Sequence, residues 1–134
     1  SVLSKKAAAG STHVVIDIPV GPTAKVRSKK AAELLSEKMI AVGLTIGLNV
    51  ATVITDGRQP IGRGIGPSLE ALDVLAVLQN VVTAPKDLRQ KAVLLASKLI
   101  EMGGKASKGE GEIVANEILH SGKAWEKFQR ICIA

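Results

Sequence analysis

The chain has 134 residues, of which 46% are hydrophobic and 22% are charged. This length accommodates one ordinary domain, or part of a larger one, and excludes a two-domain enzyme with complete halves. No apolar run is long enough, and free enough of glycine and charge, to span a bilayer, which excludes an integral membrane protein. The one cysteine, Cys132, excludes an internal disulfide framework and a multi-cysteine zinc site. Since the N-terminus is unlike a signal peptide, we expect a cytoplasmic protein.

The net charge of +6 raises the question of a nucleic-acid partner, because clustered lysine and arginine side chains release counterions from phosphates. The excess is local: residues 1–30 carry six basic side chains against one acidic, and residues 31–134 carry twelve against eleven. Aromatic residues make up only 1% of the chain and provide no platform for base stacking. We therefore favour a solvated face or a small-anion site, and we expect no nucleic-acid partner.

The first half of the chain alternates between predicted helices and strands. Residues 2–9 favour a helix, and residues 13–20 form a short run rich in β-branched side chains, typical of a buried strand. Ser28 is a suitable N-cap for a helix over 29–46, and residues 49–55 repeat the pattern of a buried strand. Strand, helix and strand at this spacing predict a right-handed parallel crossover.

The second half is predicted to be helical, which makes the fold class α/β with strands early and helices late. Proline residues introduce helices over 68–80 and 86–102, and two shorter helices follow over 110–120 and 122–131. The apolar residues at helical spacing in the two longer helices are expected to be buried: Leu69, Leu72, Leu75, Ala76, Leu78, Leu88, Val93, Leu95, Leu99 and Ile100.

A glycine-rich loop over residues 56–66 is the strongest candidate for chemistry. It holds four glycines and one proline in eleven residues, so its backbone can approach an ion closely with carbonyl or amide groups. The loop follows a strand and precedes a helix, and open parallel sheets bind ligands at the carboxyl ends of their strands. Its glycine spacing matches neither the dinucleotide fingerprint nor the Walker pattern. A tight turn with only a packing role remains an equal alternative.

Two pairs of polar residues share a face of their predicted element. Ser1 and Lys5 are four apart on a helix, where a hydroxyl and an ammonium could address one ligand, although such pairs are common on solvated helices. His13 and Asp17 are four apart on a strand, and we interpret them as satisfied polar groups. His120 is expected to cap carbonyls at a helix end.

The remaining unusual side chains have structural interpretations. Cys132 is expected to be a buried apolar residue, because no histidine lies near it in sequence to activate the thiol. Trp125 and Phe128, three residues apart, are expected to lie in the core or in a contact with further protein. A metal site of the histidine and cysteine type has no basis in this sequence.

Three motifs carry a resemblance to a known family. They are Ser1–Lys6 (SVLSKK), Val15–Gly21 (VIDIPVG) and Thr55–Glu70 (TDGRQPIGRGIGPSLE). In order and spacing they resemble thymidine phosphorylase and its pyrimidine-nucleoside and AMP phosphorylase relatives, and they are most similar to the branch with AMP phosphorylases and the second type of thymidine phosphorylase. The resemblance spans nearly the whole chain, and beyond residue 85 it rests mainly on the pattern of helices.

The resemblance implies reversible phosphorolysis by a pentosyltransferase: phosphate is the co-substrate, and thymidine gives free base and deoxyribose 1-phosphate. The alternative within the family is an AMP phosphorylase that gives adenine and ribose 1,5-bisphosphate. Outside it, an anthranilate phosphoribosyltransferase type would use a phosphoribosyl diphosphate and magnesium, and the motifs fit the phosphorylases better. A non-enzymatic nucleic-acid-binding module is the remaining class.

The resemblance also assigns roles to individual positions. Ser1 and Lys5 match the serine and lysine that hold the pyrimidine, while Ile61, Gly64 and Asp73 match positions where some relatives bind a monovalent or divalent cation. Asp73 stands where the longer glutamate is usual, and further cation ligands would come from outside this chain. The family's phosphate-binding segment has no equivalent here, and no residue of this chain is expected to be catalytic.

The resemblance implies that the chain is a central fragment of such an enzyme. Residues 1–10 would be the end of the small helical domain with a hinge near residues 9–12, and residues 11–134 would be an incomplete part of the mixed-sheet α/β domain. The family commonly dimerises through its helical domain, so a homodimer is expected for the full-length protein. The fragment alone is expected to be inactive.

Overall fold

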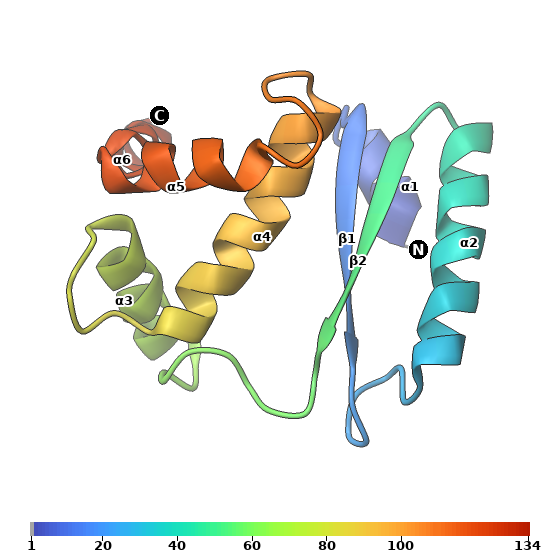
Figure 1. Ribbon diagram of the computed structural model, residues 1–134, viewed down its shortest axis with the longest axis horizontal. Coiled ribbons are helices and arrows are strands. Elements are labelled where there is room, and N and C mark those ends of the chain that lie inside the picture. The colour runs from blue at the N-terminus through green and yellow to red at the C-terminus, as the bar shows by residue number, and fades with distance from the viewer. Residues whose placement is uncertain (1) are drawn as a thin grey trace. The chain divides into compact units, whose positions relative to one another are not determined.

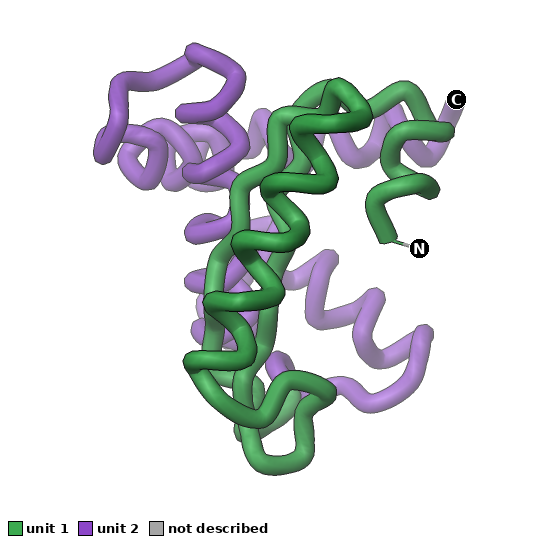
Figure 2. Tube along the Cα trace, turned by 90° about the vertical axis from the view of Figure 1, so that its right-hand side faces the viewer, with its two compact units in different colours: residues 1–60 green, residues 61–134 purple. Residues whose placement is uncertain are grey.

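The computed structural model describes residues 2–134. Over this range the chain forms six helices and two strands (Figure 1), in the order α1 (Val2–Ala8), β1 (His13–Val20), α2 (Lys29–Thr45), β2 (Asn49–Asp56), α3 (Pro67–Leu78), α4 (Lys86–Met102), α5 (Gly111–His120) and α6 (Lys123–Ile133). It divides into two compact units, residues 1–60 and 61–134, shown in green and purple in Figure 2. The mixed α/β class and every predicted element are confirmed, each boundary lying close to its predicted position.

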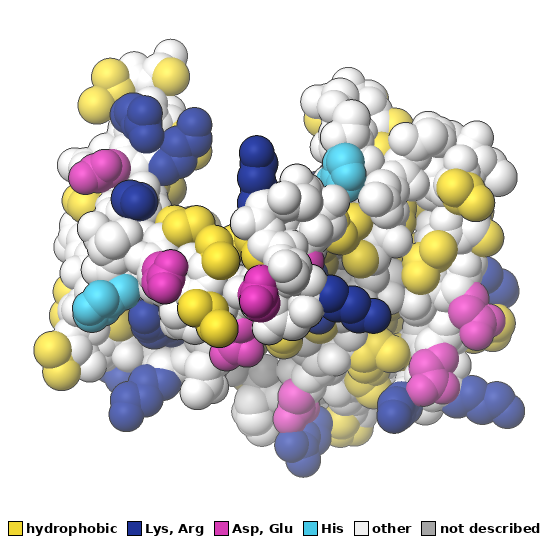
Figure 3. All heavy atoms as spheres, turned by 45° about the horizontal axis from the view of Figure 1, so that its top comes forward, with side chains coloured by type: hydrophobic (Ala, Val, Ile, Leu, Met, Phe, Trp, Pro, Cys, Tyr) yellow, Lys and Arg dark blue, Asp and Glu magenta, His cyan; other side chains and the backbone are white. Residues whose placement is uncertain are grey.

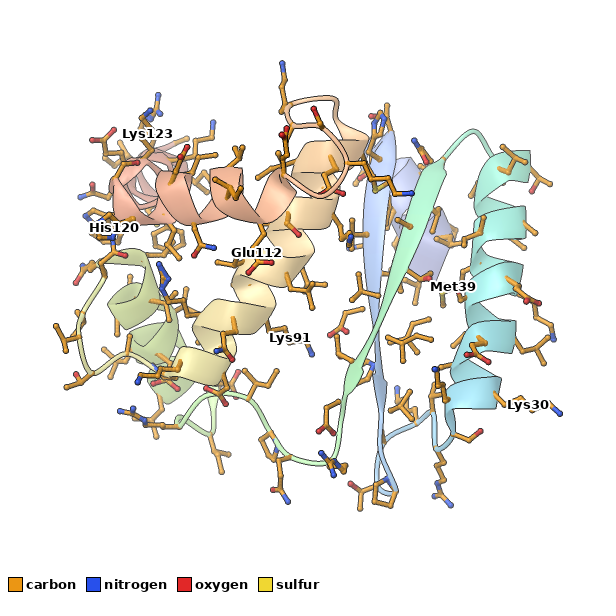
Figure 4. All side chains as sticks on the ribbon, viewed as in Figure 1. Lys30, Met39, Lys91, Glu112, His120 and Lys123 are labelled. Carbon is orange, nitrogen blue, oxygen red and sulfur yellow. The ribbon has the colours of Figure 1, made fainter. Side chains whose placement is uncertain are left out.

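The first unit is a strand–helix–strand arrangement with α1 added to it. Strands β1 and β2 pair in parallel, from His13 opposite Asn49 to Val20 opposite Asp56, which confirms the predicted parallel crossover. Helix α2 packs on β2, and Met39 extends from it toward the strands (Figure 4). Buried apolar side chains form the core of this unit: Leu3, Val14, Leu48 and Val50, with Ile16 and Met39 packed against them.

Helix α2 begins where the sequence predicts, because Ser28 caps it. The backbone of Ser28 is extended, with φ −141° and ψ 152°, and its Oγ accepts a hydrogen bond of 3.2 Å from the N–H of Ala31. We expect Ser28→Ala to lower the free energy of unfolding by about 1 kcal/mol, since an N–H of the first turn loses its partner. Urea unfolding measures this change, with the nearby exposed Thr23→Ala as a control within about 0.5 kcal/mol of the wild type. Equal stability in all three proteins would contradict the assignment.

The second unit is helical, and its core lies between α3, α4, α5 and α6. Val77, Val93, Ala115 and Leu119 are its buried apolar residues. The contact between α4 and α5 is close, because a Cβ at Gly111 would overlap the carbonyl oxygen of Ser97. The Glu101 carboxylate accepts the N–H groups of Gly109 at 2.9 Å and of Gly111 at 3.1 Å. It thus joins the end of α4 to the beginning of α5.

Four sequence-based expectations of burial are wrong. Leu69 is 54% exposed, Leu72 61% and Leu99 46%, and Cys132 is also exposed. A periodic apolar pattern identifies a helix, but the neighbouring elements decide which of its sides they cover. Val77, rather than the leucines at the start of α3, is the buried residue of that helix. Apolar side chains accordingly lie among charged ones on the surface shown in Figure 3.

Helix α6 has no buried residue, and Ala124 is its side chain that packs against the core of the second unit. Trp125 and Phe128 stack with ring centroids 6.0 Å apart and planes at 22°, and neither is fully buried.

Among the described residues, no helix is both long and apolar enough to cross a membrane.

Candidate functional site

The parallel strands end together, and two glycines bring the following segments into contact there. A Cβ added to Gly21 would lie 2.6 Å from the carbonyl oxygen of Gly57 and 2.9 Å from the nitrogen of Arg58. The N–H of Gly57 donates to the carbonyl of Val20 at 2.8 Å, so the backbone pairing continues past the end of β2. The two glycine-containing motifs that follow the strands therefore pack against each other through their backbones.

Polar side chains at this end of the strands are paired. The hydroxyl of Thr55 donates to Asp17 Oδ1 at 2.6 Å, which satisfies the carboxylate as expected from its place on the strand. Asp56 accepts hydrogen bonds from Arg58, with Nη2 2.6 Å from Oδ2 and the backbone N–H 2.9 Å from Oδ1. The side-chain hydrogen bond from Arg58 lowers the pKa of Asp56 to about 2. Asp56 is therefore ionised at neutral pH and is not poised for proton transfer.

In the second unit, carboxylates hold the backbone of the glycine-rich loop. Asp73 Oδ2 accepts the N–H groups of Arg63 at 2.6 Å and of Gly64 at 2.8 Å. Two further hydrogen bonds join Gly62 N–H to Asp87 Oδ2 at 3.1 Å and Gly66 N–H to Glu70 Oε1 at 3.0 Å. A Cβ at Gly62 would lie 2.7 Å from Asp73 Oδ2, so only glycine leaves room for this carboxylate. The loop is thus held by α3 and by the first residues of α4.

These contacts give the acidic residues a structural role that sequence analysis missed. Glu70 and Asp87 lie in the first turns of α3 and α4, where acidic residues are favourable. Their place at the start of two predicted helices is the sequence feature from which this role could have been inferred. The N–H groups of Gly62, Arg63, Gly64 and Gly66 already have carboxylate partners within the chain. In this arrangement the loop does not offer these four N–H groups to a phosphate.

Asp73 makes the stability of the loop dependent on pH. Hydrogen bonds from the backbone N–H groups of Gly64 and Arg63 lower its pKa below the ordinary 3.8. A lowered pKa means that this stabilisation is fully present above about pH 4 and is lost as the pH falls through the lowered value. We expect Asp73→Asn to destabilise the protein at neutral pH, and the difference from wild type to shrink below pH 3.8.

Urea unfolding at pH 7 and near pH 3 measures this difference. Glu112→Gln is the matched control, because Glu112 is an exposed carboxylate on α5, away from the loop (Figure 4). If both variants differ from the wild type by the same amount at each pH, general loss of charge explains the effect and the Asp73 contacts do not.

Lys5, the predicted base-binding residue that the structure describes, lies apart from Gly57 within the first unit. Ser1 lies outside the described residues, and Lys5 is exposed on α1. Helix α1 packs, through Leu3, near the first residues of the strands, whereas Gly57 follows their last residues. A strand rises about 3.3 Å per residue, so eight-residue strands separate the two places by roughly 20 Å. Within the first unit the structure does not join Lys5 to Gly57.

The basic residues that cluster in the sequence are divided in space. Lys5 and Lys6 lie on α1, while Lys25 and Arg27 belong to the turn after β1, at the other end of the strands. Lys30 lies in the first turn of α2 and points away from the strands (Figure 4). The local excess of positive charge therefore does not form one patch in this unit.

The three predicted cation ligands are only partly brought together. Gly64 contacts Asp73 through its N–H, and no contact joins Ile61 to that carboxylate within the described hydrogen bonds. A cation would need oxygen ligands, whereas the Asp73 oxygen nearest the loop is already engaged by two N–H donors. Over residues 2–134 no group of three or more His, Cys, Asp or Glu side chains is arranged to hold a metal ion.

The remaining candidate side chains have local partners or lie on the surface. His13 Nδ1 lies 3.0 Å from the hydroxyl of Thr12. His120 is exposed, and the helix end there is instead contacted by Asn80, whose Nδ2 donates to the carbonyl of Leu119 at 2.8 Å. Asn80 has a positive φ of 55°, a conformation that asparagine adopts more readily than most other residues with a side chain.

The fold and this site define a mixed α/β segment, in which a parallel strand–helix–strand unit leads through a glycine-rich loop into a helical unit. No protein-family model matches the chain. Curated relatives do: the whole chain is 61% identical to "Putative thymidine phosphorylase 1" of Acidovorax sp. (strain JS42). It is 60% identical to "Putative thymidine phosphorylase" of Polaromonas sp. and 58% identical to the protein of that name from Parvibaculum lavamentivorans, again over all 134 residues.

The resemblance predicted from the sequence motifs is therefore confirmed. The chain spans 26% of the length of each of these relatives. What the relatives' names state concerns proteins about four times as long as this chain.

Proposed function

We propose that this chain is a segment of a pentosyltransferase that catalyses reversible phosphorolysis of thymidine to free base and deoxyribose 1-phosphate. One observation carries the proposal: the identity of 58–61% over the whole chain to relatives named for thymidine phosphorylase. Identity at this level extends through both compact units, beyond the three motifs. It supports a transferase of nucleoside metabolism, and it favours thymidine over the AMP phosphorylase alternative.

In the proposed reaction an oxygen of phosphate attacks C1′ of the nucleoside as the bond from C1′ to the base nitrogen breaks. The electron pair of that bond goes to the base, so negative charge develops on the pyrimidine. A donor aimed at its carbonyls then binds the transition state more strongly than the ground state. Lys5 is our candidate for this donor, together with Ser1. Its ammonium group is on an exposed part of α1, where a substrate can reach it.

The cation site of Ile61, Gly64 and Asp73 stays a prediction with weaker support. The carboxylate oxygen nearest the loop serves as an acceptor for N–H groups, so we assign no step of the reaction to a cation. Thermal unfolding with and without potassium or calcium tests the site. A bound cation would raise the melting temperature, and indifference to both ions would reject it.

The arrangement of the complete enzyme is also a proposal. We place residues 1–10 at the end of a small helical domain, residues 11–134 in an incomplete α/β domain, and the phosphate site outside this chain. A cytoplasmic homodimer without nucleic-acid or membrane partners completes the proposal. Size-exclusion chromatography with light scattering would test the dimer.

The decisive experiment is phosphate-dependent base release by the complete protein that carries this segment. Thymidine, uridine and AMP are offered side by side, with and without phosphate, and free base is measured by chromatography. Release of thymine that requires phosphate is the expected result. Release from AMP alone would move the protein to the nucleotide phosphorylases, and no release from a folded protein would reject phosphorolysis.

A further inference from the structure

The Asp73 carboxylate lies where the glycine-rich loop meets α3. Its Oδ2 accepts the N–H of Arg63 at 2.6 Å and the N–H of Gly64 at 2.8 Å, from residues ten and nine positions away along the chain. The two donors are consecutive, so one carboxylate oxygen holds two adjacent peptide units. Hydrogen bonds from N–H groups to an ionised carboxylate are stronger than those between neutral groups. Asp73 therefore fixes the middle of the loop.

Two glycines let the loop approach this carboxylate and α3. Gly62 has φ 79°, and a Cβ there would lie 2.7 Å from Asp73 Oδ2. A Cβ at Gly64 would overlap the backbone carbonyl of Leu69, in the first turn of α3. A side chain at either position would displace the loop from the place where its N–H groups reach the carboxylate. The glycines and Asp73 thus form one arrangement.

Two further carboxylates hold the ends of the same loop. Asp87 Oδ2 accepts the N–H of Gly62 at 3.1 Å, and Glu70 Oε1 accepts the N–H of Gly66 at 3.0 Å. Glu70 belongs to the first turn of α3 and Asp87 to the first turn of α4. The loop therefore joins the beginnings of two helices, and the chain itself supplies every one of these acceptors.

The negative charge of Asp73 is also balanced within the chain. Hydrogen bonds from the N–H groups of Gly64 and Arg63 lower the pKa of Asp73, and the positive charge of the Arg63 side chain lowers it further. A cation at this carboxylate would be repelled by that positive charge. A carboxylate oxygen offers about two lone-pair sites, and two N–H donors already use those of Oδ2. The groups around Asp73 therefore suit a carboxylate held by N–H donors and do not suit a metal ion, which needs free oxygen ligands.

We infer that Asp73 closes the glycine-rich loop by itself, so that the loop keeps its conformation without a bound cation. The N–H groups of Arg63 and Gly64 occupy the place that a metal ion would take at this carboxylate. The inference is an alternative to a cation held by Ile61, Gly64 and Asp73, because both would use the same carboxylate. It concerns the loop alone, and it stands or falls whether or not the complete protein carries out phosphorolysis.

Hydrogen exchange of the complete protein, resolved to single amides, tests the inference without any measurement of activity. The wild type is compared at one ionic strength in potassium chloride, calcium chloride and tetramethylammonium chloride, whose bulky cation oxygen ligands do not coordinate. We expect the amides of Arg63 and Gly64 to exchange at rates within about twofold of each other in the three salts. Slower exchange in potassium or calcium by more than this factor would show that a cation closes the loop, and would overturn the inference.

A pair of variants tests whether Asp73 is the closing group. In Asp73→Ala the amides of Arg63 and Gly64 should exchange about tenfold faster or more in every salt, because they lose their acceptor. Glu70→Ala is the matched control, since it removes an acidic side chain from the same helix, and its faster exchange should be confined to Gly66. Unchanged exchange in Asp73→Ala, or an equal increase at Arg63 and Gly64 in Glu70→Ala, would overturn the inference. The comparison of salts uses the wild type, so it still decides if Asp73→Ala does not fold.

Discussion

Replacing Lys5 by alanine is expected to slow phosphorolysis of thymidine by the complete protein by about one to two orders of magnitude. A charge-assisted hydrogen bond contributes about 1.5–3 kcal/mol, and this one strengthens as negative charge develops on the leaving base. The loss should therefore be seen in kcat as well as in kcat/KM. Steady-state rates of thymine release at saturating phosphate measure both.

Lys6→Ala is the matched control for this prediction. Lys6 is also exposed on α1 and carries the same charge, but it lies about 100° around the helix from Lys5. The control removes one positive charge from the same helix and should leave the rate within about twofold of the wild type, as expected for a surface change. An unchanged rate in Lys5→Ala would remove Lys5 from the base site, and equal losses in the two variants would point to the overall charge of α1.

Gly21→Ala is expected to lower the free energy of unfolding by about 1–3 kcal/mol, the usual range for overpacking. The added Cβ would lie 2.6 Å from the carbonyl oxygen and 2.7 Å from the carbonyl carbon of Gly57. These are backbone atoms, so rotation of a side chain cannot relieve the overlap, and one of the two segments must move. Urea unfolding of the wild type and the variant measures the loss.

Two comparisons make the Gly21 prediction specific. Thr23→Ala lies in the same turn but is exposed, so its stability should stay within about 0.5 kcal/mol of the wild type. Gly57→Ala places a Cβ 2.9 Å from Pro19 Cβ and should also destabilise the protein. Because both substitutions separate the same two segments, the double variant should lose less than the sum of the single losses. Full additivity, or a stable Gly21→Ala, would contradict the close approach.

The glycine motifs thus have a structural reason as well as a proposed functional one. In the first unit, Gly21 and Gly57 allow two backbones to meet at the carboxyl ends of the strands. In the second unit, Gly62 makes room for the carboxylate of Asp73, which holds the loop by its N–H groups. Sequence analysis left open whether the loop binds a ligand or only packs. The hydrogen bonds of the described loop support the packing role.

Local patterns in the sequence were sufficient to predict the elements and their order. Ser28 marks the start of α2 because a side-chain acceptor at that position satisfies an N–H of the first turn. The two β-branched runs separated by a helix predict parallel pairing, because a helix of that length returns the chain to the same end of the sheet. The three motifs also predicted the relatives, since their residues and spacing can be compared directly without any structure.

Only the tertiary structure decided which side of each helix is buried and which residues distant in the sequence form hydrogen bonds with each other. Leu69 and Leu72 fit a helical stripe yet are exposed, and Cys132 is apolar yet lies on the surface. The carboxylate partners of the loop N–H groups, Glu70 and Asp87 among them, are up to 25 residues away along the chain. Helix periodicity and capping depend on neighbours within a turn, so a sequence determines them locally. Burial and long-range hydrogen bonds depend on how separate elements pack, which no local pattern contains.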